Sequence, residues 1–424
     1  MYSNDKRTVV TLDAGGTNFV FGAIQGNKQI VNSITTPSNS HDLDLCLKTL
    51  SHGFANIIES LDTPPVAISF AFPGPADYPS GIIGGYLPNF PSFREGVALG
   101  PYLEEKFGIP VFINNDADLF AYGEAMAGAL PRVNEMLEKE GSAKRYSNLL
   151  AYTWGTGFGF GFASSGKLHI GDNSCTETFC LPLRHHPEII AEEGVSARAI
   201  VREYLNAGGE DLSALKKYFR HTGAKAFIQT DGSLLTEDNF ELTPATIFNI
   251  AEGAGPGGED PGISEQDLTL GRSQSSSQTR VSTSPNTQIA RNRTAAIKSF
   301  QHFGEASGDA IATAATLIDG LIVIGGGITA ARKYIMPSLL SVMREKMHTF
   351  GGDTLGRLQF SVYDLDNPQE FSLFAKGESK VLDVYGTTRK VTYDPQKRTG
   401  ITISTLGASR AISLGAYSYA LSHL

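Results

Sequence analysis

The chain has 424 residues, of which 41% are hydrophobic and 19% charged, so it holds enough apolar material for a folded core. At roughly 150 residues per domain, this length predicts two or three domains. The formal charge of −9 argues against a protein that grips nucleic acid through clustered cations, and 3 cysteines are too few for a disulfide framework.

The amino-terminal segment shows no targeting or anchoring pattern. Its first apolar run, Val9-Val10-Thr11-Leu12, stops at Asp13, far short of a signal-peptide core. No apolar run along the chain reaches the ~18 residues that a membrane helix requires. We therefore expect a soluble, cytoplasmic protein that binds neither membranes nor nucleic acid.

Taken in chain order, the first third of the sequence alternates β-rich runs with segments whose apolar residues recur every three or four positions. The β-rich runs predict strands and the spaced segments predict helices. We expect strands at 8–12, 19–24 and 30–35, a helix at 43–61, a strand at 66–72, a helix at 102–107, a strand at 111–113 and a helix at 118–130.

The same plan starts again near residue 149. It predicts strands at 149–153 and 158–163, helices at 197–205 and 294–318, a strand at 321–324 and a helix ending at about 348. Because a strand–turn–strand carrying Gly-Thr opens each half, the pattern indicates internal duplication. We predict an α/β protein of two duplicated lobes with a central cleft, one lobe at 1–130 and the other at 145–424.

Two segments depart from this plan. Residues 253–290 are dense in Gly, Pro, Ser and Gln, which favours a mobile surface insertion over a packed element. Residues 363–394 look like additional material, with expected strands at 371–374 and 381–385. The sequence assigns no role to either segment.

The strongest local signal is the turn Asp13-Ala14-Gly15-Gly16-Thr17-Asn18. Adjacent glycines let backbone amides approach a phosphate, and a carboxylate at the strand end can hold hydrated magnesium beside it. A lone Gly-Gly would be an ordinary hairpin turn. The second copy, Gly155-Thr156-Gly157, weakens that alternative, because two such turns facing one cleft would grip a polyphosphate from both sides.

A third glycine cluster, Gly325-Gly326-Gly327, lies between a buried strand and a helix. Bare backbone there can admit an adenine or a ribose, although close packing of helix on strand explains the cluster equally well. Neither a Walker loop nor a Gly-x-Gly-x-x-Gly dinucleotide loop is present.

Asn114-Asn115-Asp116 ends the predicted strand at 111–113. A carboxylate beside an amide at a strand end suits a general base that takes a proton from an alcohol. With the phosphate turns nearby, the reaction would be phosphoryl transfer to a sugar hydroxyl. The alternative is a helix-capping turn, for which Asp118 is a second candidate cap.

In their order along the chain, these motifs resemble the ROK family of repressors, open reading frames and kinases. The resemblance covers most of the chain except the Gly/Ser-rich insertion and the extra segment after about Gly351, and it includes the carboxyl-terminal run from Leu406 to Ala416. It rests on Asp13–Asn18, Phe72-Pro73-Gly74-Pro75-Ala76-Asp77, Asn115-Asp116-Ala117-Asp118, Gly155–Gly159 and Gly325–Gly327.

The resemblance implies an actin-like ATPase (ribonuclease H-like) fold and a glucokinase-like hexose kinase that uses ATP and Mg²⁺. It makes Asp116 the catalytic base and Asp13 the magnesium-positioning residue. It implies that ATP binds at Asp13, Gly15, Gly16, Thr17, Asn18, Gly155, Thr156, Gly157, Gly325, Gly326 and Gly327, and that the sugar binds at Gly74, Asn89, Asn115, Glu177 and Glu192. Glu193 is the rival of Glu192 if the register slips by one.

The sequence departs from the family at its zinc site. Cys180 stands where the family has a histidine that joins three cysteines on zinc, and the cysteine run itself is absent. Cys175, Cys180, His185 and His186 match no common zinc spacing, so we do not expect zinc. One of the two histidines could replace the missing imidazole, although an exposed loop position is favoured.

Other members of the family supply the alternative functions. A sugar-sensing regulator would need a helix-turn-helix, yet only 12 residues precede Asp13 here. A sugar-binding protein with weak ATPase activity is the third possibility, since the zinc site is lost. Family members commonly form dimers, so we expect a homodimer. The identity of the sugar stays open.

Overall fold

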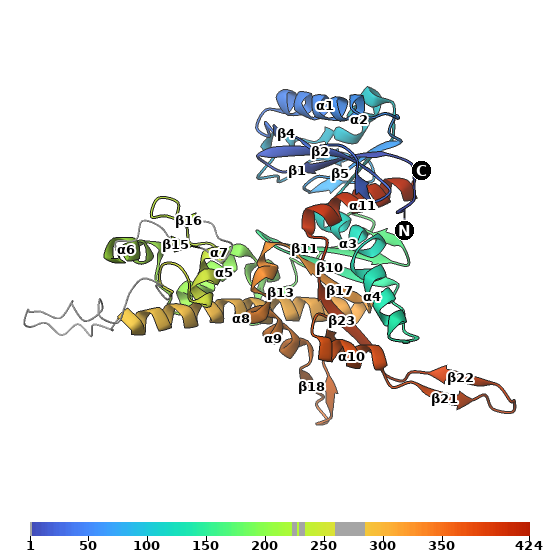
Figure 1. Ribbon diagram of the computed structural model, residues 1–424, viewed down its shortest axis with the longest axis vertical. Coiled ribbons are helices and arrows are strands. Elements are labelled where there is room, and N and C mark those ends of the chain that lie inside the picture. Colours follow the sequence, from blue (N-terminus) through green and yellow to red (C-terminus); the bar gives the residue numbers. More distant parts are fainter. Residues whose placement is uncertain (1, 223–226, 229–233, 259–284) are drawn as a thin grey trace, which may run out of the picture.

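The computed structural model describes residues 2–222, 227–228, 234–258 and 285–424. It consists of two α/β lobes, and each is built on a six-stranded sheet (Figure 1). In each lobe the first two strands pair antiparallel and the later central strands pair parallel to the first. The predicted duplication and α/β class are therefore present in the strand pairing.

The sheet of the amino-terminal lobe has the order β3-β2-β1-β5-β9, with β4 also paired to β2. Helices α1 and α2 contact this sheet, and a small sheet of β6, β7 and β8 lies between β5 and α2 in the chain. The bounds are β1 Val9–Ala14, β2 Asn18–Gln25, β3 Lys28–Gln29, β4 Ile34–Pro37, α1 Leu43–Glu59, β5 Ala67–Ala71, β6 Ala76–Asp77, β7 Ile82–Ile83, β8 Val97–Ala98, α2 Leu99–Phe107 and β9 Val111–Asn114.

Helix α1 shows how the sequence pattern becomes structure. The Asp42 side chain caps it by accepting the Leu45 N–H at 3.0 Å. Its buried residues include Leu50, Phe54 and Ile57, which recur at spacings of four and three and pack on the sheet. This part of the fold follows from local patterning alone.

The second sheet has the order β12-β11-β10-β17-β23-β20. Helices α8 and α9 share its larger core, while α3, α4 and α10 share the core on its other face. The bounds are α3 Asp116–Met126, α4 Ala129–Lys139, β10 Asn148–Trp154, β11 Phe158–Ser164, β12 Lys167–His169, α5 Ala197–Asn206, α6 Leu212–Thr222, α7 Pro244–Glu252, α8 Pro285–Ile318, β17 Leu321–Gly325, α9 Arg332–Met343, β20 Ser361–Asp364, α10 Pro368–Lys376 and β23 Arg398–Ile403.

Two helices join the lobes. The last helix, α11 (Ala408–Ser422), returns to lie against β1, β5 and α3 (Figure 1). A Cβ on Gly123 would lie 1.9 Å from the Ala411 carbonyl oxygen, and one on Gly415 would lie 1.8 Å from that of Leu119. Only glycine permits this backbone-to-backbone crossing of α3 and α11.

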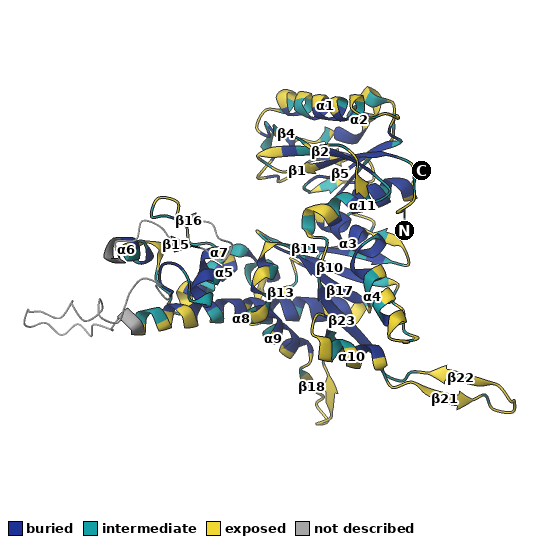
Figure 2. Cartoon of the chain, viewed as in Figure 1, coloured by how far each residue is buried: buried dark blue, intermediate teal, exposed yellow. Residues whose placement is uncertain are grey.

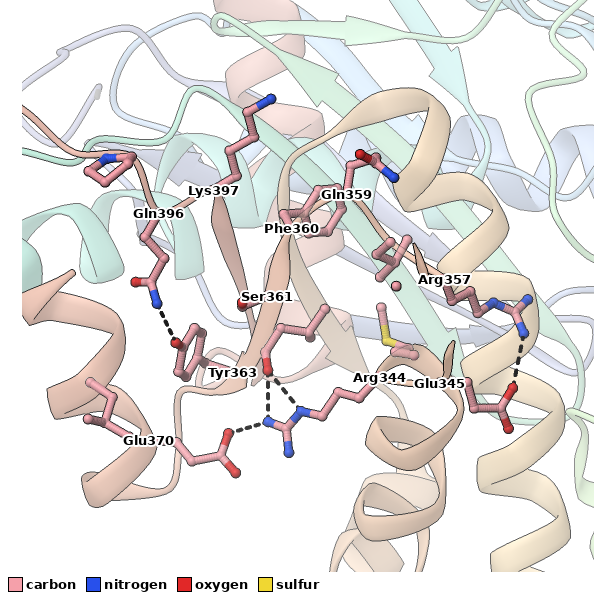
Figure 3. Close-up of a pocket in the computed structure, with 16 residues that line it drawn as sticks. Arg344, Glu345, Arg357, Gln359, Phe360, Ser361, Tyr363, Glu370, Gln396 and Lys397 are labelled. Carbon is pink, nitrogen blue, oxygen red and sulfur yellow. Dashed lines mark hydrogen bonds and ion pairs between the residues drawn. The ribbon is translucent and has the colours of Figure 1, made fainter. Parts of the chain in front are cut away.

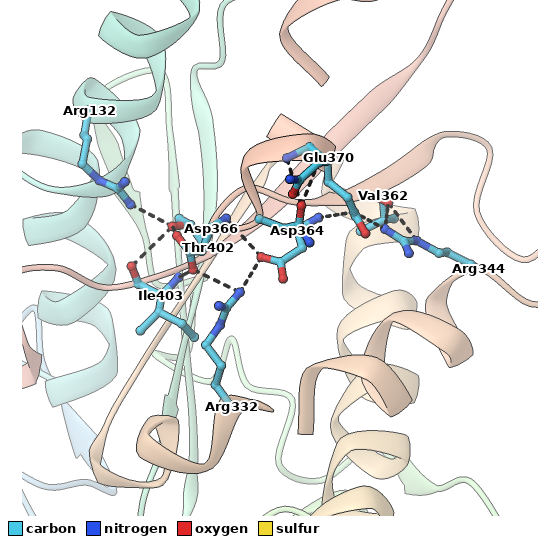
Figure 4. A network of polar contacts seen from close by, with 11 residues as sticks. Arg132, Arg332, Arg344, Val362, Asp364, Asp366, Glu370, Thr402 and Ile403 are labelled. Carbon is cyan, nitrogen blue, oxygen red and sulfur yellow. Dashed lines mark hydrogen bonds and ion pairs between the residues drawn. The ribbon is translucent and has the colours of Figure 1, made fainter. Parts of the chain in front are cut away.

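A polar network ties the carboxyl-terminal edge of the second sheet together (Figure 4). Arg132 of α4 donates to Thr402 of β23 at 2.8 Å, and Thr402 donates to Asp366 at 2.7 Å. Arg332, at the start of α9, pairs with both Asp364 and Asp366. The network fixes the helix that follows the third glycine cluster.

Several sequence expectations need correction. Residues 371–374 lie in helix α10, not in a strand, because Asn367 caps that helix through the N–H groups of Gln369 and Glu370. The single helix expected at 118–130 is two, α3 and α4. A Cβ at Gly128 between them would lie 2.2 Å from the Glu124 carboxylate, which accepts the Ala129 N–H.

Further corrections concern boundaries. Helix α9 ends at Met343, and residues up to 348 form strand β18 (Lys346–His348). The segment at 363–394 is not all additional material, because β20 is part of the main sheet. The insertion expected at 253–290 ends earlier, since α8 starts at Pro285, and residues 259–284 lie outside the described part of the chain.

Candidate active site

The first glycine turn joins β1 to β2. Ala14 pairs with Phe19, and the Gly15 N–H closes the turn on the Asn18 carbonyl at 3.0 Å. A Cβ on Gly16 would lie 2.9 Å from Cβ of Asn89. Glycine therefore lets this turn touch Asn89, which the sequence assigned to the sugar.

Two serines hold this turn and were missed from the sequence. The Ser40 hydroxyl donates to the Gly16 carbonyl at 3.1 Å, and the Ser38 hydroxyl also donates to it. The Ser38 N–H donates to the Thr17 carbonyl at 2.9 Å. They follow β4 and carry no motif, so only the pairing of β4 with β2 reveals them.

Asp116 opens helix α3 at the carboxyl end of β9. The cap of this helix is Asn115, whose side-chain oxygen accepts the Ala117 N–H at 2.8 Å, and not Asp118. The Asp116 carboxylate accepts the same N–H at 2.8 Å yet remains exposed. The surrounding protein raises the pKa of Asp116 by desolvation, and the Asp13 charge raises it further.

A cluster of acidic groups surrounds Asp116. Asp118 is 7% exposed, its Oδ1 has no hydrogen-bond partner among the described residues, and burial beside Asp116 raises its pKa to about 8. Burial, followed by the charges of Asp118, Asp116 and Glu192, raises the pKa of Glu177 to about 8. Side chains from both lobes thus lie within electrostatic reach of one another.

Tyr78 completes the floor of the cluster. It donates to the Phe72 carbonyl at 2.9 Å and is buried. Its pKa is raised by burial, while a hydrogen bond with Asn115 opposes that shift. A Cβ on Gly74 would lie 2.9 Å from the Tyr78 hydroxyl, so Gly74 also belongs to this surface.

The second glycine turn joins β10 to β11, with Trp154 paired to Phe158. A carboxylate covers it: Glu192 accepts the Phe158 N–H at 3.0 Å and the Arg198 guanidinium at 2.9 Å. A Cβ on Gly157 would lie 2.6 Å from the same Glu192 oxygen that accepts the Phe158 N–H. Glu192 therefore touches the turn directly.

Glu193, the rival of Glu192, is engaged elsewhere. It pairs with Arg198 at 2.7 Å and with Arg202 at 3.0 Å. The Arg198 hydrogen bond lowers the pKa of Glu193. The geometry places Glu192, and not Glu193, beside the acidic cluster.

The third glycine cluster divides into two parts. A Cβ on Gly325 would lie 2.5 Å from the Phe120 ring, and one on Gly326, whose φ is +98°, would lie 2.2 Å from the Trp154 carbonyl. Packing explains these two glycines. Only Gly327 faces open space, with no atom within 4 Å of its Cβ position.

The residues weighed for zinc are exposed and do not gather into one site. Cys175 and Cys180 are exposed free thiols, and exposed His185 and His186 line a separate hollow with His302. Among the described residues, no three His, Cys, Asp or Glu side chains are grouped to hold a metal. Asp13 is the candidate magnesium ligand. Its residue is exposed and its carboxylate forms no ion pair with the described residues, so its oxygens are suitable donors for Mg²⁺.

The chain is similar to known proteins in sequence and in structure. A family model, the ROK family, matches residues 9–178. The chain is 48% identical to a glucokinase from Parabacteroides distasonis, covering 100% of both chains with a TM-score of 0.78.

More distant matches agree with that result. A glucokinase from Thermotoga maritima is 27% identical over 167 residues, which are 39% of this chain and 47% of that protein. An N-acetyl-D-glucosamine kinase from Vibrio parahaemolyticus matches over 48% of its length. The chain therefore spans about half the length of the curated relatives it matches. A ROK family glucokinase from Streptomyces griseus, solved with glucose and AMPPNP, is 18% identical over 97% of this chain and 98% of its own, with a TM-score of 0.53.

These structural matches show that the fold is the actin-like ATPase fold, as the resemblance to the ROK family implied. No helix in the described residues is long and apolar enough to cross a membrane.

Proposed function

The chain belongs to the ROK family, and we propose on this premise that it is an ATP-dependent hexose kinase, glucokinase-like, with Asp116 as the general base. The observation that carries the proposal is the meeting of three features between the two lobes. Asp116 lies within electrostatic reach of Asp13 beside the first glycine turn and of Glu177 from the opposite lobe. Glu192, which also acts on Glu177, touches the second glycine turn.

In this proposal Asp116 takes the proton from the sugar hydroxyl. A general base works best when its pKa lies near the working pH, and the surroundings of Asp116 shift its pKa in that direction. Asn115, held as the cap of α3, would orient the hydroxyl beside it. Gly74, Asn89, Glu177 and Glu192 would complete the sugar pocket, with glucose or a close relative as substrate.

The two glycine turns would hold the phosphates of ATP, with Gly15, Gly16, Thr17 and Asn18 on one side and Gly155, Thr156 and Gly157 on the other. Asp13 would hold hydrated Mg²⁺, which, when bound, neutralises phosphate charge. Open space at Gly327 favours the adenosine end there, with Gly325 and Gly326 shaping the strand end behind it.

Rotation of the lobes about the crossing of α3 and α11 would close the cleft. Closure excludes water, so that the sugar hydroxyl receives the phosphoryl group in preference to hydrolysis. A reaction that consumes ATP and a free hexose would place the protein in the cytoplasm.

A screen of sugars tests the proposal. ADP release and sugar phosphate would be measured with ATP and glucose, mannose, fructose, allose or N-acetylated amino sugars, and sugar-free reactions serve as the control. We expect ADP and sugar phosphate in equal amounts with glucose or a close relative. An ADP release rate that is the same with and without sugar would indicate a weak ATPase. No ADP release with any sugar would favour a binding protein or regulator.

A further inference from the structure

Two hairpins project from the carboxyl-terminal lobe, on the side opposite the amino-terminal lobe (Figure 1). The short arm is the hairpin of β18 and β19 (Thr354–Gly356), and the long arm is that of β21 (Lys380–Asp383) and β22 (Lys390–Tyr393). Nearly all of their strand residues are exposed (Figure 2). An isolated two-stranded hairpin is at best marginally stable in water, so these arms need a partner surface.

Both arms carry large apolar side chains into solvent. Phe350 and Tyr385, at their tips, are fully exposed. On the short arm the exposed apolar side chains are Met347, Phe350 and Leu355, and on the long arm Val381, Leu382, Tyr385 and Tyr393. The two aromatic and two aliphatic side chains of the long arm offer on the order of 500 Å² per copy, toward the ~800 Å² per partner of a standard stable interface, and a groove that receives the arm supplies the rest.

A groove of about 720 Å³ lies between the bases of the arms (Figure 3). Gly356 of the short arm and Pro395, just past the long arm, both line it. Phe360 and Leu373 supply apolar lining, and Arg344 and Glu370 pair with each other within it. The groove is thus part of the same face as the two arms.

The charges on this face are mixed. On the long arm, Lys390 pairs with Asp383 at 3.6 Å. Neither the arm nor the groove presents the single-sign field that nucleic acid or a membrane surface would select. A surface with both signs and apolar residues can instead be complementary to itself.

The geometry points to a second copy of this chain as the occupant: we propose that the long arm of each protomer seats in the groove of the other. At ~3.3 Å per residue, a leg of about eight residues carries the tip roughly 25 Å from the arm's base beside the groove. The arm therefore reaches a neighbour more readily than its own groove. A two-fold axis places the same arm over the same groove on both partners.

Sedimentation of the full-length chain tests the proposal. We expect wild type to be a dimer, and Val381→Ser/Leu382→Ser/Tyr385→Ser to raise the dimer dissociation constant at least 30-fold. Leu45→Ser removes a side chain that is 46% exposed on α1, in the other lobe and far from the arms (Figure 1), and should leave that constant unchanged. A monomeric wild type, or equal effects of the two variants, would overturn the proposal.

Cross-linking tests the seating of the arm. Tyr385→Cys and Gln359→Cys proteins, each also carrying Cys175→Ser and Cys180→Ser, would be mixed and treated with a short bismaleimide. We expect the mixed pair to be the main product, because Gln359 lines the groove. A dimer that yields no mixed product would refute this seating.

Discussion

The two glycine turns have the same strand–turn–strand design, yet their surroundings differ. The first is braced within its own lobe, where Ser38 and Ser40 hold the Gly16 carbonyl and Asn89 packs against the turn. The second is covered by Glu192, whose carboxylate accepts the Phe158 N–H. A carboxylate there takes a donor that a phosphate would use. If the turns bind ATP as proposed, the first turn is preformed for phosphate and the second would have to exchange Glu192 for it.

Gly16→Ala breaks the braced turn and has the largest effect expected of any substitution in the two glycine turns. The new Cβ would displace Asn89, so the proposed positions of the phosphate and the sugar would both shift. In an active site, a misplacement of about 1 Å can lower the rate about 100-fold. We therefore expect kcat/KM to fall about 100-fold. Initial-rate kinetics would check this, and a value within threefold of wild type would show that the contact with Asn89 is dispensable.

Asp118→Asn tests the acidic cluster between the turns. The folded protein keeps the Asp118 proton up to about pH 8, whereas the unfolded chain loses it near 3.8, so this group lowers stability progressively as pH rises between those values. We expect Asp118→Asn to raise the unfolding free energy by roughly 5 kcal/mol at pH 8 and by roughly 2 kcal/mol at pH 5.

Urea unfolding at both pH values measures this difference. Asp62→Asn, at an exposed position, is the control and should change stability equally little at each. A gain for Asp118→Asn that does not grow with pH would mean that the buried carboxyl does not hold its proton.

Gly155→Ala probes the uncovered part of the second turn. No atom lies within 4 Å of the added Cβ and no left-handed φ is required, so the melting temperature should not change. The methyl group would stand where phosphate approaches, and we expect the KM for ATP to rise about 10-fold with sugar affinity unchanged. An unaltered KM for ATP would remove this turn from the nucleotide site.

Glu192→Gln tests whether the Glu192 carboxylate, which covers the second turn, competes there with phosphate. Removing its negative charge should tighten binding of a non-hydrolysable ATP analogue about threefold without sugar, and weaken sugar binding. Calorimetry measures both. Glu193→Gln is the matched control, because that carboxylate pairs with Arg198 and Arg202, and similar changes in the two variants would contradict the assignment.

Much of the fold could be predicted from the sequence because its signals are local. Helix α1 follows from its apolar spacing and strand β5 from a short buried run. The strand expected at 371–374 was wrong, although Asn367-Pro368 already carried a helix-start signal that the prediction did not use.

The candidate site was predictable only where a motif marked it. Asp116 and the glycine turns can be recognised from residue type and spacing. Ser40, Arg198 and Tyr78 belong to no motif, and their roles come from contacts with residues distant in the sequence or in other elements. Asp118 could be seen only as a helix cap, since its burial depends on α11 returning from the end of the chain. Because α3 and α11 are far apart in the sequence, no local pattern in either helix predicts that they pack together.

The most direct measurement is the turnover of Asp116→Asn beside its affinity for the sugar. If Asp116 is the base, kcat falls about 1,000-fold while the calorimetric sugar dissociation constant stays within about threefold of wild type. A kcat within tenfold of wild type would contradict Asp116 as the base, whatever the sugar affinity.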